Sequence, residues 1–440
     1  MSDLKKILMG HKIGGFPLFI MVLFLAFVFI AMYTGGLGGD MISTISFTLV
    51  LGLVLNAIGN QIPILNKYLG AGLLLCIFVP SYLVFKGVIT EGVVDSTKNF
   101  FSFGGVQYLT FFIVVLMTNS MLNIDKKVLG KCIGRFIPLL LITVLGALGI
   151  TVLVGVLLGV DVKTTTTEFV FPIMASGTSG AAALNQIFAN AGGINEEAYF
   201  SSAVANVILA TTLCIFFAIL LNLIGTLFPK LTGDKKTLLR GGKGGEITED
   251  KAVELPQASV SDVLSGLLLA GMVFVLSGVF SALIPSVKGI ELHQYAYMVI
   301  ILLILNITDV VPPNIKSGVK TLTTFSVHLL MPMICVCLGM TLMSWESFMS
   351  AFNPTTLILV LTCLASSCIV AGIFGHILGL FAVDSAITAA LCQADMGGGA
   401  DIAILLPSDR MGLIAYATVA SRIGYAIVLI LASIIFPIVI

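Results

Sequence analysis

MGLIAYATVASRIGYAIVLILASIIFPIVI, residues 411–440, closes the chain and decides its fold class. The segment is long enough to cross a bilayer as one helix, since about 20 apolar residues span the hydrocarbon core. Arg422 lies in its middle, about 18 Å along a helix from the preceding charge, Arg410. The core is about 30 Å thick, so we expect Arg422 near mid-membrane. A permanent cation there costs several kcal/mol unless an anionic or polar group meets it. An anionic substrate is the natural partner.

The composition is that of a polytopic membrane protein. Hydrophobic residues make up 58% of the chain and charged residues 10%, against about 25% charged in a soluble domain. The mean hydropathy is +1.12. The 22 basic and 22 acidic residues cancel, which gives no indication of a nucleic-acid partner. All eight cysteines lie within or beside apolar segments and form no CxxC pair, which favours core packing over disulfides or a zinc site.

Apolar runs recur along the whole chain. They predict spanning helices at about 14–34, 43–59, 68–88, 104–122, 133–160, 198–229, 263–285, 293–311, 321–343, 355–380 and 411–438. Two further apolar segments, 168–190 and 384–406, are broken by Gly, Ser and Pro. Each is too irregular for a clean span and long enough for a re-entrant hairpin. The predicted fold is all-α, with about 11 transmembrane helices and two hairpins.

The charges of the loops support this topology. With eleven spans and two hairpins, the groups of Lys and Arg fall on one face, which the positive-inside rule makes cytoplasmic. The basic groups precede the first span, follow the fourth, fill the 230–260 loop, follow the eighth and precede the last. If each broken segment were a single span, the rule would fail for two of these groups. We therefore predict a cytoplasmic N-terminus and an outside C-terminus in the cell membrane.

The same count divides the chain into an inverted repeat. Residues 1–40 hold an extra helix, 41–229 the first repeat with its hairpin at 168–190, 230–260 a cytoplasmic linker, and 261–440 the second repeat with its hairpin at 384–406. Inverted repeats with broken helices in matching positions point to a secondary transporter whose site lies where the breaks meet.

The hairpins carry small-residue motifs, Ser176–Gly180 and Gly397–Asp401. Small residues let two backbone tips approach and expose amides and carbonyls. Amides at helix N-termini suit an anion, and carbonyls suit Na⁺. The plainer alternative is tight helix packing.

Several polar residues near the second motif leave alternatives open. Asp395 and Asp401 flank the tip and could bind a cation, pair with Arg422 or sit in a wet crevice. Asp384 is a third candidate for a purely structural ion pair with Arg422. Asn206, in the span after the first hairpin, could tie helices together or contact ligand.

A set of short strings is similar to the 2-hydroxycarboxylate transporter family. They are QIPIL at 61–65, LCIFVPS at 75–81, PIMA at 172–175, EAYFS at 197–201, and the stretch from Cys392 through the Gly run to SRIG at 421–424. The likeness runs in order over most of the chain. It implies a Na⁺- or H⁺-coupled carrier for citrate, malate or related acids, working as a homodimer by an elevator mechanism.

The resemblance also implies roles for residues. Substrate would bind between the two tips and the last span, and Na⁺ around the second hairpin. The implied substrate residues are Ser176, Gly177, Thr178, Ser179, Gly398, Gly399 and Arg422; the candidate Na⁺ ligands are Cys392 through its carbonyl, Asp395, Asp401 and Ser421.

Two departures from the family's pattern affect the predicted substrate. Ser176–Ser179 replaces two glycines of the first GGxG motif with hydroxyl residues, and Met396 stands where citrate carriers place an Arg. Each carboxylate left without a charged partner costs about 1.5–3 kcal/mol, which favours a dicarboxylate such as malate. The alternatives are a proton-coupled or exchange carrier for citrate or lactate, or a channel. We expect no enzyme activity and no cofactor beyond the coupling ion, since no nucleophile–base pair can be placed on facing helices.

Overall fold

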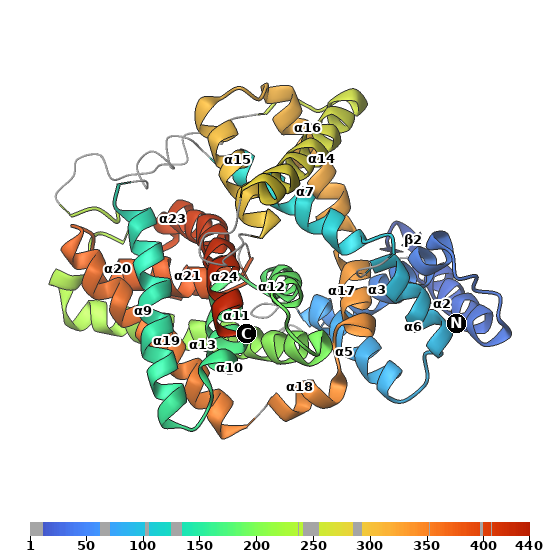
Figure 1. Cartoon of the computed structure of the whole chain (residues 1–440), viewed down its shortest axis with the longest axis horizontal. Helices are drawn as coiled ribbons and strands as arrows, with labels where there is room; N and C mark the ends of the chain where they lie inside the picture. The colour runs from blue at the N-terminus through green and yellow to red at the C-terminus, as the bar shows by residue number, and fades with distance from the viewer. Residues whose placement is uncertain are drawn as a thin grey trace, which may run out of the picture. The chain divides into compact units, whose positions relative to one another are not determined.

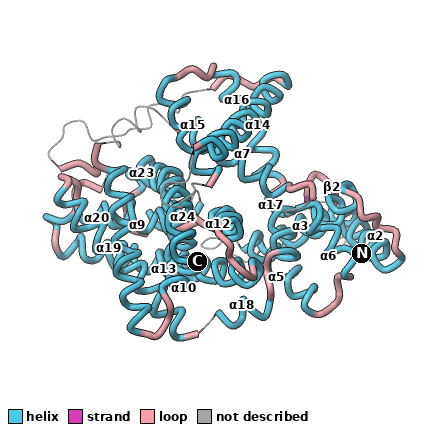
Figure 2. The backbone as a smooth tube through the Cα atoms, viewed as in Figure 1, coloured by secondary structure: helices cyan, strands magenta, loops and turns pink. Residues whose placement is uncertain are grey.

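The computed structural model describes residues 12–61, 71–101, 105–124, 134–235, 237–240, 255–284, 293–351, 353–396, 399–405 and 407–440. Helices make up about four-fifths of this part of the chain (Figures 1 and 2). Its strands, β1 (Lys12–Ile13) and β2 (Phe16–Pro17), pair antiparallel before the first helix. The predicted all-α class is therefore confirmed.

Six helices of the described residues are long and apolar enough to cross a membrane. They are α3 (Met41–Asn60), α9 (Phe136–Leu157), α13 (Glu196–Leu227), α14 (Val260–Leu283), α19 (Pro354–Ile377) and the interrupted helix Met411–Val439. Shorter apolar helices are α2 (Leu18–Thr34), α5 (Ala71–Phe85), α7 (Tyr108–Leu122) and α15 (Gln294–Thr308). Every predicted span holds one of these, except 321–343. There, α16 (Pro313–Thr323), the π-helix η3 (Thr324–Leu329) and α17 (Met331–Thr341) follow one another.

The chain divides into two compact units, each with its own internal contacts. The smaller unit comprises Met1–Ile113 and Thr323–Met349, and the larger unit comprises Val114–Leu322 and Ser350–Ile440. Each unit draws residues from both predicted repeats. The larger unit contains both broken segments and the last span, so every predicted site residue belongs to it.

Close helix contacts at glycines hold the smaller unit together. A Cβ on Gly52 of α3 would lie 2.6 Å from the backbone of Pro332, and one on Gly339 of α17 would meet the carbonyl of Ile77 in α5. Only glycine allows backbones to approach this closely, a common means of helix association in membranes. The hydroxyl of Ser81 adds a hydrogen bond to the carbonyl of Met343, at 3.0 Å.

The larger unit is built around α9 and α19, which lie side by side (Figure 1). The second broken segment packs against both helices, and α13 packs against both broken segments. These contacts place the two broken segments within one core.

The broken segments have the same internal order. The first consists of α10 (Val162–Thr164), the π-helix η1 (Thr165–Val170), α11 (Phe171–Met174), an interruption and α12 (Thr178–Asn190). The second consists of α20 (Ala382–Ser385), the π-helix η4 (Ala386–Leu391), α21 (Cys392–Ala394), an interruption and α22 (Gly399–Leu405). The helical run is interrupted at Ala175–Gly177 in the first segment and at Asp395–Met396 in the second, where residues 397–398 lie outside the described part of the chain. That each segment enters and leaves on one side remains a prediction.

The last span is also irregular at its centre. It runs through the 3₁₀ turn η5 (Met411–Leu413), α23 (Ile414–Val419), the π-helix η6 (Ala420–Gly424) and α24 (Tyr425–Val439). Arg422 therefore lies within a π-helical turn, a form frequently found at functional sites.

Several short elements were not predicted. α6 (Glu91–Phe101) and α18 (Trp345–Ala351) follow apolar spans, most of α16 lies in the predicted loop before residue 321, and the 3₁₀ turn η2 (Pro229–Leu231) lies at the start of the linker. α6 has Glu91, Asp95 and Lys98 on one side and a buried apolar side. A search for long apolar runs misses a helix of this kind because only half of its surface is apolar.

Candidate functional site

The two interruptions meet in the larger unit. Gly177 has φ +98°, and a Cβ there would lie 3.1 Å from the Cα of Met396. The neighbouring Ser176 also has a positive φ, +55°. Its hydroxyl lies 3.1 Å from the carbonyl oxygen of Gln393 and 3.0 Å from that of Ser421. Ser176 thus joins the first tip to both the second tip and the last span.

Three buried groups gather just beyond this junction. Ligand atoms of Cys392, Asp395 and Asp401 all lie within 4.8 Å of one another. The Ser421 hydroxyl lies 3.0 Å from the Cys392 carbonyl and 3.1 and 3.2 Å from the two carboxylate oxygens of Asp401. The structure therefore brings together all four candidate cation ligands.

The donor set at this cluster suits a hard cation. Two carboxylates, a hydroxyl and a carbonyl are the oxygen ligands that such cations prefer. Two buried carboxylates this close repel each other, and a bound cation removes the repulsion. The thiol of Cys392 packs beside these groups, while its carbonyl faces Ser421.

The structure describes most of the residues predicted to bind substrate. Thr178 begins α12 and is buried, Ser179 is half-buried beside it, and Gly399 begins α22. The first amides of a helix have no partner within the helix and are suited to an anion. Gly398 lies outside the described residues.

Arg422 is half-buried in η6. Its Nη1 donates a long hydrogen bond of 3.4 Å to the carbonyl of Asn123. Across the described ranges it makes no ion pair, so the structural pairing with Asp384, Asp395 or Asp401 is not seen. The guanidinium remains available for a ligand anion.

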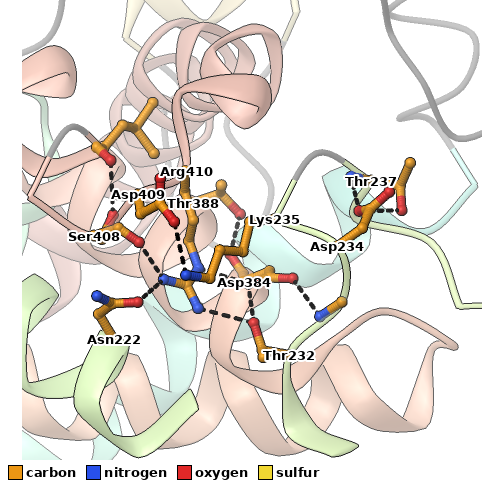
Figure 3. Close-up of polar contacts among 12 residues, drawn as sticks. Asn222, Thr232, Asp234, Lys235, Thr237, Asp384, Thr388, Ser408, Asp409 and Arg410 are labelled. Atoms are coloured by element: carbon orange, nitrogen blue, oxygen red, sulfur yellow. Dashed lines mark hydrogen bonds and ion pairs between the residues drawn. The ribbon is translucent and has the colours of Figure 1, made fainter. Parts of the chain in front are cut away.

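Asp384 instead pairs with the other arginine of this region, Arg410. The Nε of Arg410 donates to Asp384 at 2.7 Å, and both side chains are fully buried (Figure 3). A second ion pair lies nearby, in which the exposed Asp409 accepts from Lys235 at 2.8 Å. The contact with Lys235 holds the pKa of the Asp409 carboxyl below its usual range.

The sequence analysis placed Arg410 in a basic loop and did not predict its pairing. The sequence offered one indication of the pair, since Asp384 begins one apolar segment and Arg410 directly precedes the next.

Two amide side chains complete the surroundings. Asn206 of α13 donates to the carbonyl of Glu168 in η1 at 2.7 Å. It therefore ties two helices together, which was the first of the two roles considered for it. The sequence analysis did not single out Gln393. Its side chain is fully buried and packs against Gly424, where an added Cβ would lie 2.6 Å from the Gln393 Cδ. Neither amide atom of Gln393 forms a hydrogen bond with another described residue.

Comparisons with known proteins agree on one family. The model of the 2-hydroxycarboxylate transporter family matches residues 13–434. A citrate/sodium symporter of Salmonella typhimurium is 31% identical over 98% of this chain and 95% of its own length. The malate transporter MleP of Lactococcus lactis is 28% identical, over 98% of each chain. The citrate transporter CitP of Lactococcus lactis is also 28% identical, over 96% of this chain and 93% of its own.

Proposed function

Because the chain belongs to the 2-hydroxycarboxylate transporter family, we propose that it moves a small 2-hydroxycarboxylate across the cell membrane together with Na⁺. It is an integral membrane protein and a transporter rather than an enzyme. The proposal extends to the substrate, a dicarboxylate such as malate, and to Na⁺ as the coupling ion, which the name of the symporter relative supports.

One observation carries the proposal. The tips of two separate broken segments meet beside the last span, with a cluster of buried oxygen ligands at the junction. A transporter needs its substrate and ion sites within one movable set of elements. Ser421 ligates on the cation side, and the next residue, Arg422, presents the cationic group for the anion.

The identity of the tip residues supports a dicarboxylate. Arg422 supplies one charge-assisted contact to a carboxylate, and Thr178 and Ser179 offer hydroxyls for a second polar group. Met396, which packs on Gly177, supplies no charge. A third carboxylate would therefore lack a cationic partner. Relatives of this chain carry the names of both citrate and malate transporters. We therefore base the choice of substrate on the residues of the two tips.

The loaded site is expected to cross the membrane depth as a nearly neutral unit. Na⁺ offsets the carboxylates of Asp395 and Asp401, and the substrate offsets Arg422. Charge removed in this way lowers the cost of moving the site through a low-dielectric region. The proposal includes an elevator movement in a homodimer, an inverted repeat, a cytoplasmic N-terminus and an outside C-terminus.

The test is uptake of radiolabelled malate, citrate and lactate into proteoliposomes, with and without an inward Na⁺ gradient. We expect saturable, Na⁺-stimulated uptake of malate, and a shift toward citrate in Met396→Arg. Tighter uptake of citrate than of malate by the unaltered protein would overturn the substrate. Equal uptake with a proton gradient alone would overturn the ion, and flux without saturation would indicate a channel.

A further inference from the structure

The buried ion pair of Asp384 and Arg410 lies at the centre of a larger network (Figure 3). Arg410 also donates from Nη1 to Asn222 of α13 and from Nη2 to the hydroxyl of Thr232, each at 2.8 Å. Asp384 in turn accepts from the Thr232 hydroxyl at 2.9 Å and from the amide of Gly233 at 3.1 Å. Two opposite charges are thus shared among three parts of the chain far apart in sequence.

Thr232 and Gly233 belong to the first part of the predicted linker. The described residues 230–235 and 237–240 are here named the linker strap. The strap continues along the start of the second broken segment. Leu239 and Leu380 form an antiparallel bridge, the amide of Phe381 donates to Leu238 at 3.0 Å, and the amide of Arg240 donates to Gly379 at 2.9 Å. The side chain of Arg240 also contacts His376. The strap is therefore part of the larger unit's packing.

The placement of the pair relates it to the candidate cation site. Asp384 lies in the first turn of the helical run Ala382–Ala394, which contains Cys392 and is followed by Asp395. Arg410 begins the run that reaches Ser421. The first run passes through the π-helical turn η4, and Ser421 itself lies in the π-helical turn η6; such turns are frequent at functional sites. Fixing the two starting points against each other fixes how the two ends face each other.

We propose that Asp384 and Arg410 are positioning residues for the cation site. Their ion pair clamps the linker strap, the second broken segment and the last span into one body that stays together through the transport cycle. The proposal rests on the transport function above. A buried pair is strongly sensitive to the loss of one partner, because the other charge is left uncompensated.

The first test removes both charges together, in Asp384→Asn/Arg410→Gln, since a single change leaves a buried charge and risks misfolding. The readout is Na⁺-dependent stabilisation, the rise in unfolding temperature of the purified protein with Na⁺, which requires no substrate. We expect the Na⁺ concentration for half the effect to rise at least fivefold, while the KM for malate at saturating Na⁺ changes less than twofold. Arg410→Lys keeps the charge but loses the forked contacts, and should fall between.

The matched control is Lys235→Ala/Asp409→Ala, which removes the ion pair between half-buried Lys235 and exposed Asp409 beside the clamp and should leave the Na⁺ dependence unchanged. Na⁺ dependence like that of the unaltered protein in the double variant, or an equal shift in the control, would overturn the positioning role. If the unaltered protein transports none of the acids yet is stabilised by Na⁺, the proposed function fails. The Na⁺ dependence of the unfolding temperature still tests the positioning role of Asp384 and Arg410.

The second test asks whether the strap moves with the broken segment. Leu239→Cys/Leu380→Cys places two thiols at the antiparallel bridge, while the seven native cysteines in the described residues are buried. We expect oxidation to cross-link the pair and to leave at least half of the reduced protein's uptake. Uptake that stops on oxidation and returns on reduction would show that the strap slides during transport. Failure to cross-link would show that the strap does not lie there. Either result would overturn the one-body proposal.

Discussion

Ser421 is the residue at which the ion and substrate regions join. Its hydroxyl faces Asp401 and the carbonyl of Cys392, its own carbonyl faces Ser176, and Arg422 follows it. A hydroxyl has one hydrogen and two lone pairs. It can therefore donate to Asp401 in the empty site and turn its lone pairs to a cation in the filled site.

Ser421→Ala is expected to weaken Na⁺ binding without unfolding the protein. Loss of one neutral ligand contact of about 1 kcal/mol corresponds to about a fivefold higher Na⁺ concentration for half-maximal uptake. The control is Ser433→Ala on the same span, whose buried hydroxyl donates to the carbonyl of Leu429 one turn earlier. An unchanged Na⁺ dependence in Ser421→Ala would remove this residue from the site.

Arg422→Ala is expected to abolish transport while leaving folding intact. The guanidinium makes no ion pair with another described residue, and the nearby buried Asp401 keeps its contacts with the Ser421 hydroxyl when the guanidinium is removed. Loss of a charge-assisted contact of about 1.5–3 kcal/mol lowers substrate affinity roughly 10- to 150-fold. Uptake assays and the unfolding temperature in detergent check the two parts, and retained saturable uptake would refute the role of Arg422.

At the scale of elements, the first tip depends on two residues with left-handed backbone. Gly177 combines a φ of +98° with its contact to Met396, so its lack of a side chain matters twice. The same strain without the contact occurs at Gly192, which has φ +88° and open space around its Cβ position. The two positions separate backbone conformation from tip-to-tip packing.

Gly177→Ala is therefore expected to lower the maximal uptake rate at least tenfold. A methyl group there costs about 1–2 kcal/mol in backbone strain and also pushes the two tips apart. Gly192→Ala carries only the strain and should retain uptake within about twofold. Similar losses in both variants would mean that the tip contact has no part in transport.

Helix packing in the smaller unit rests on glycine as well. Gly339→Ala in α17 is expected to destabilise the protein by about 1–3 kcal/mol, because its Cβ would meet the carbonyl of Ile77. Gly271→Ala in α14 meets nothing within 4 Å and should be neutral or slightly stabilising. Thermal unfolding of both variants in detergent measures the difference; equal midpoints would contradict the packing argument.

At the scale of the whole molecule, the predicted topology assigns described, exposed residues to opposite faces. The linker strap, with Asp234, should face the cytoplasm, and the loop with Asp161 should face outside. We expect a membrane-impermeant maleimide to label Asp161→Cys in intact cells and Asp234→Cys only in inverted vesicles. Labelling of both from one side would require a different number of crossings between them.

Much of the fold was predictable because membrane spans depend on composition over long windows. The apolar runs predicted the positions of the long helices, and the interruptions at Ser176–Gly177 and after Asp395 followed from small residues within apolar segments. The amphipathic helix Glu91–Phe101 was missed because only half of its surface is apolar, so it does not appear as a long apolar run. The π-helical turns were missed because they change backbone hydrogen bonding without a signal in composition.

Composition and short motifs were enough to identify an all-α membrane protein of one transporter family, with candidate cation ligands in the second broken segment and the last span. Those properties depend on hydrophobicity and on short motifs, which are local. Which charges meet depends on how remote segments pack. The fold pairs Asp384 with Arg410 and leaves Arg422 outside any ion pair among the described residues. Charge pairing in a low-dielectric interior depends on distances between segments remote in sequence, and spacing along the chain does not contain them.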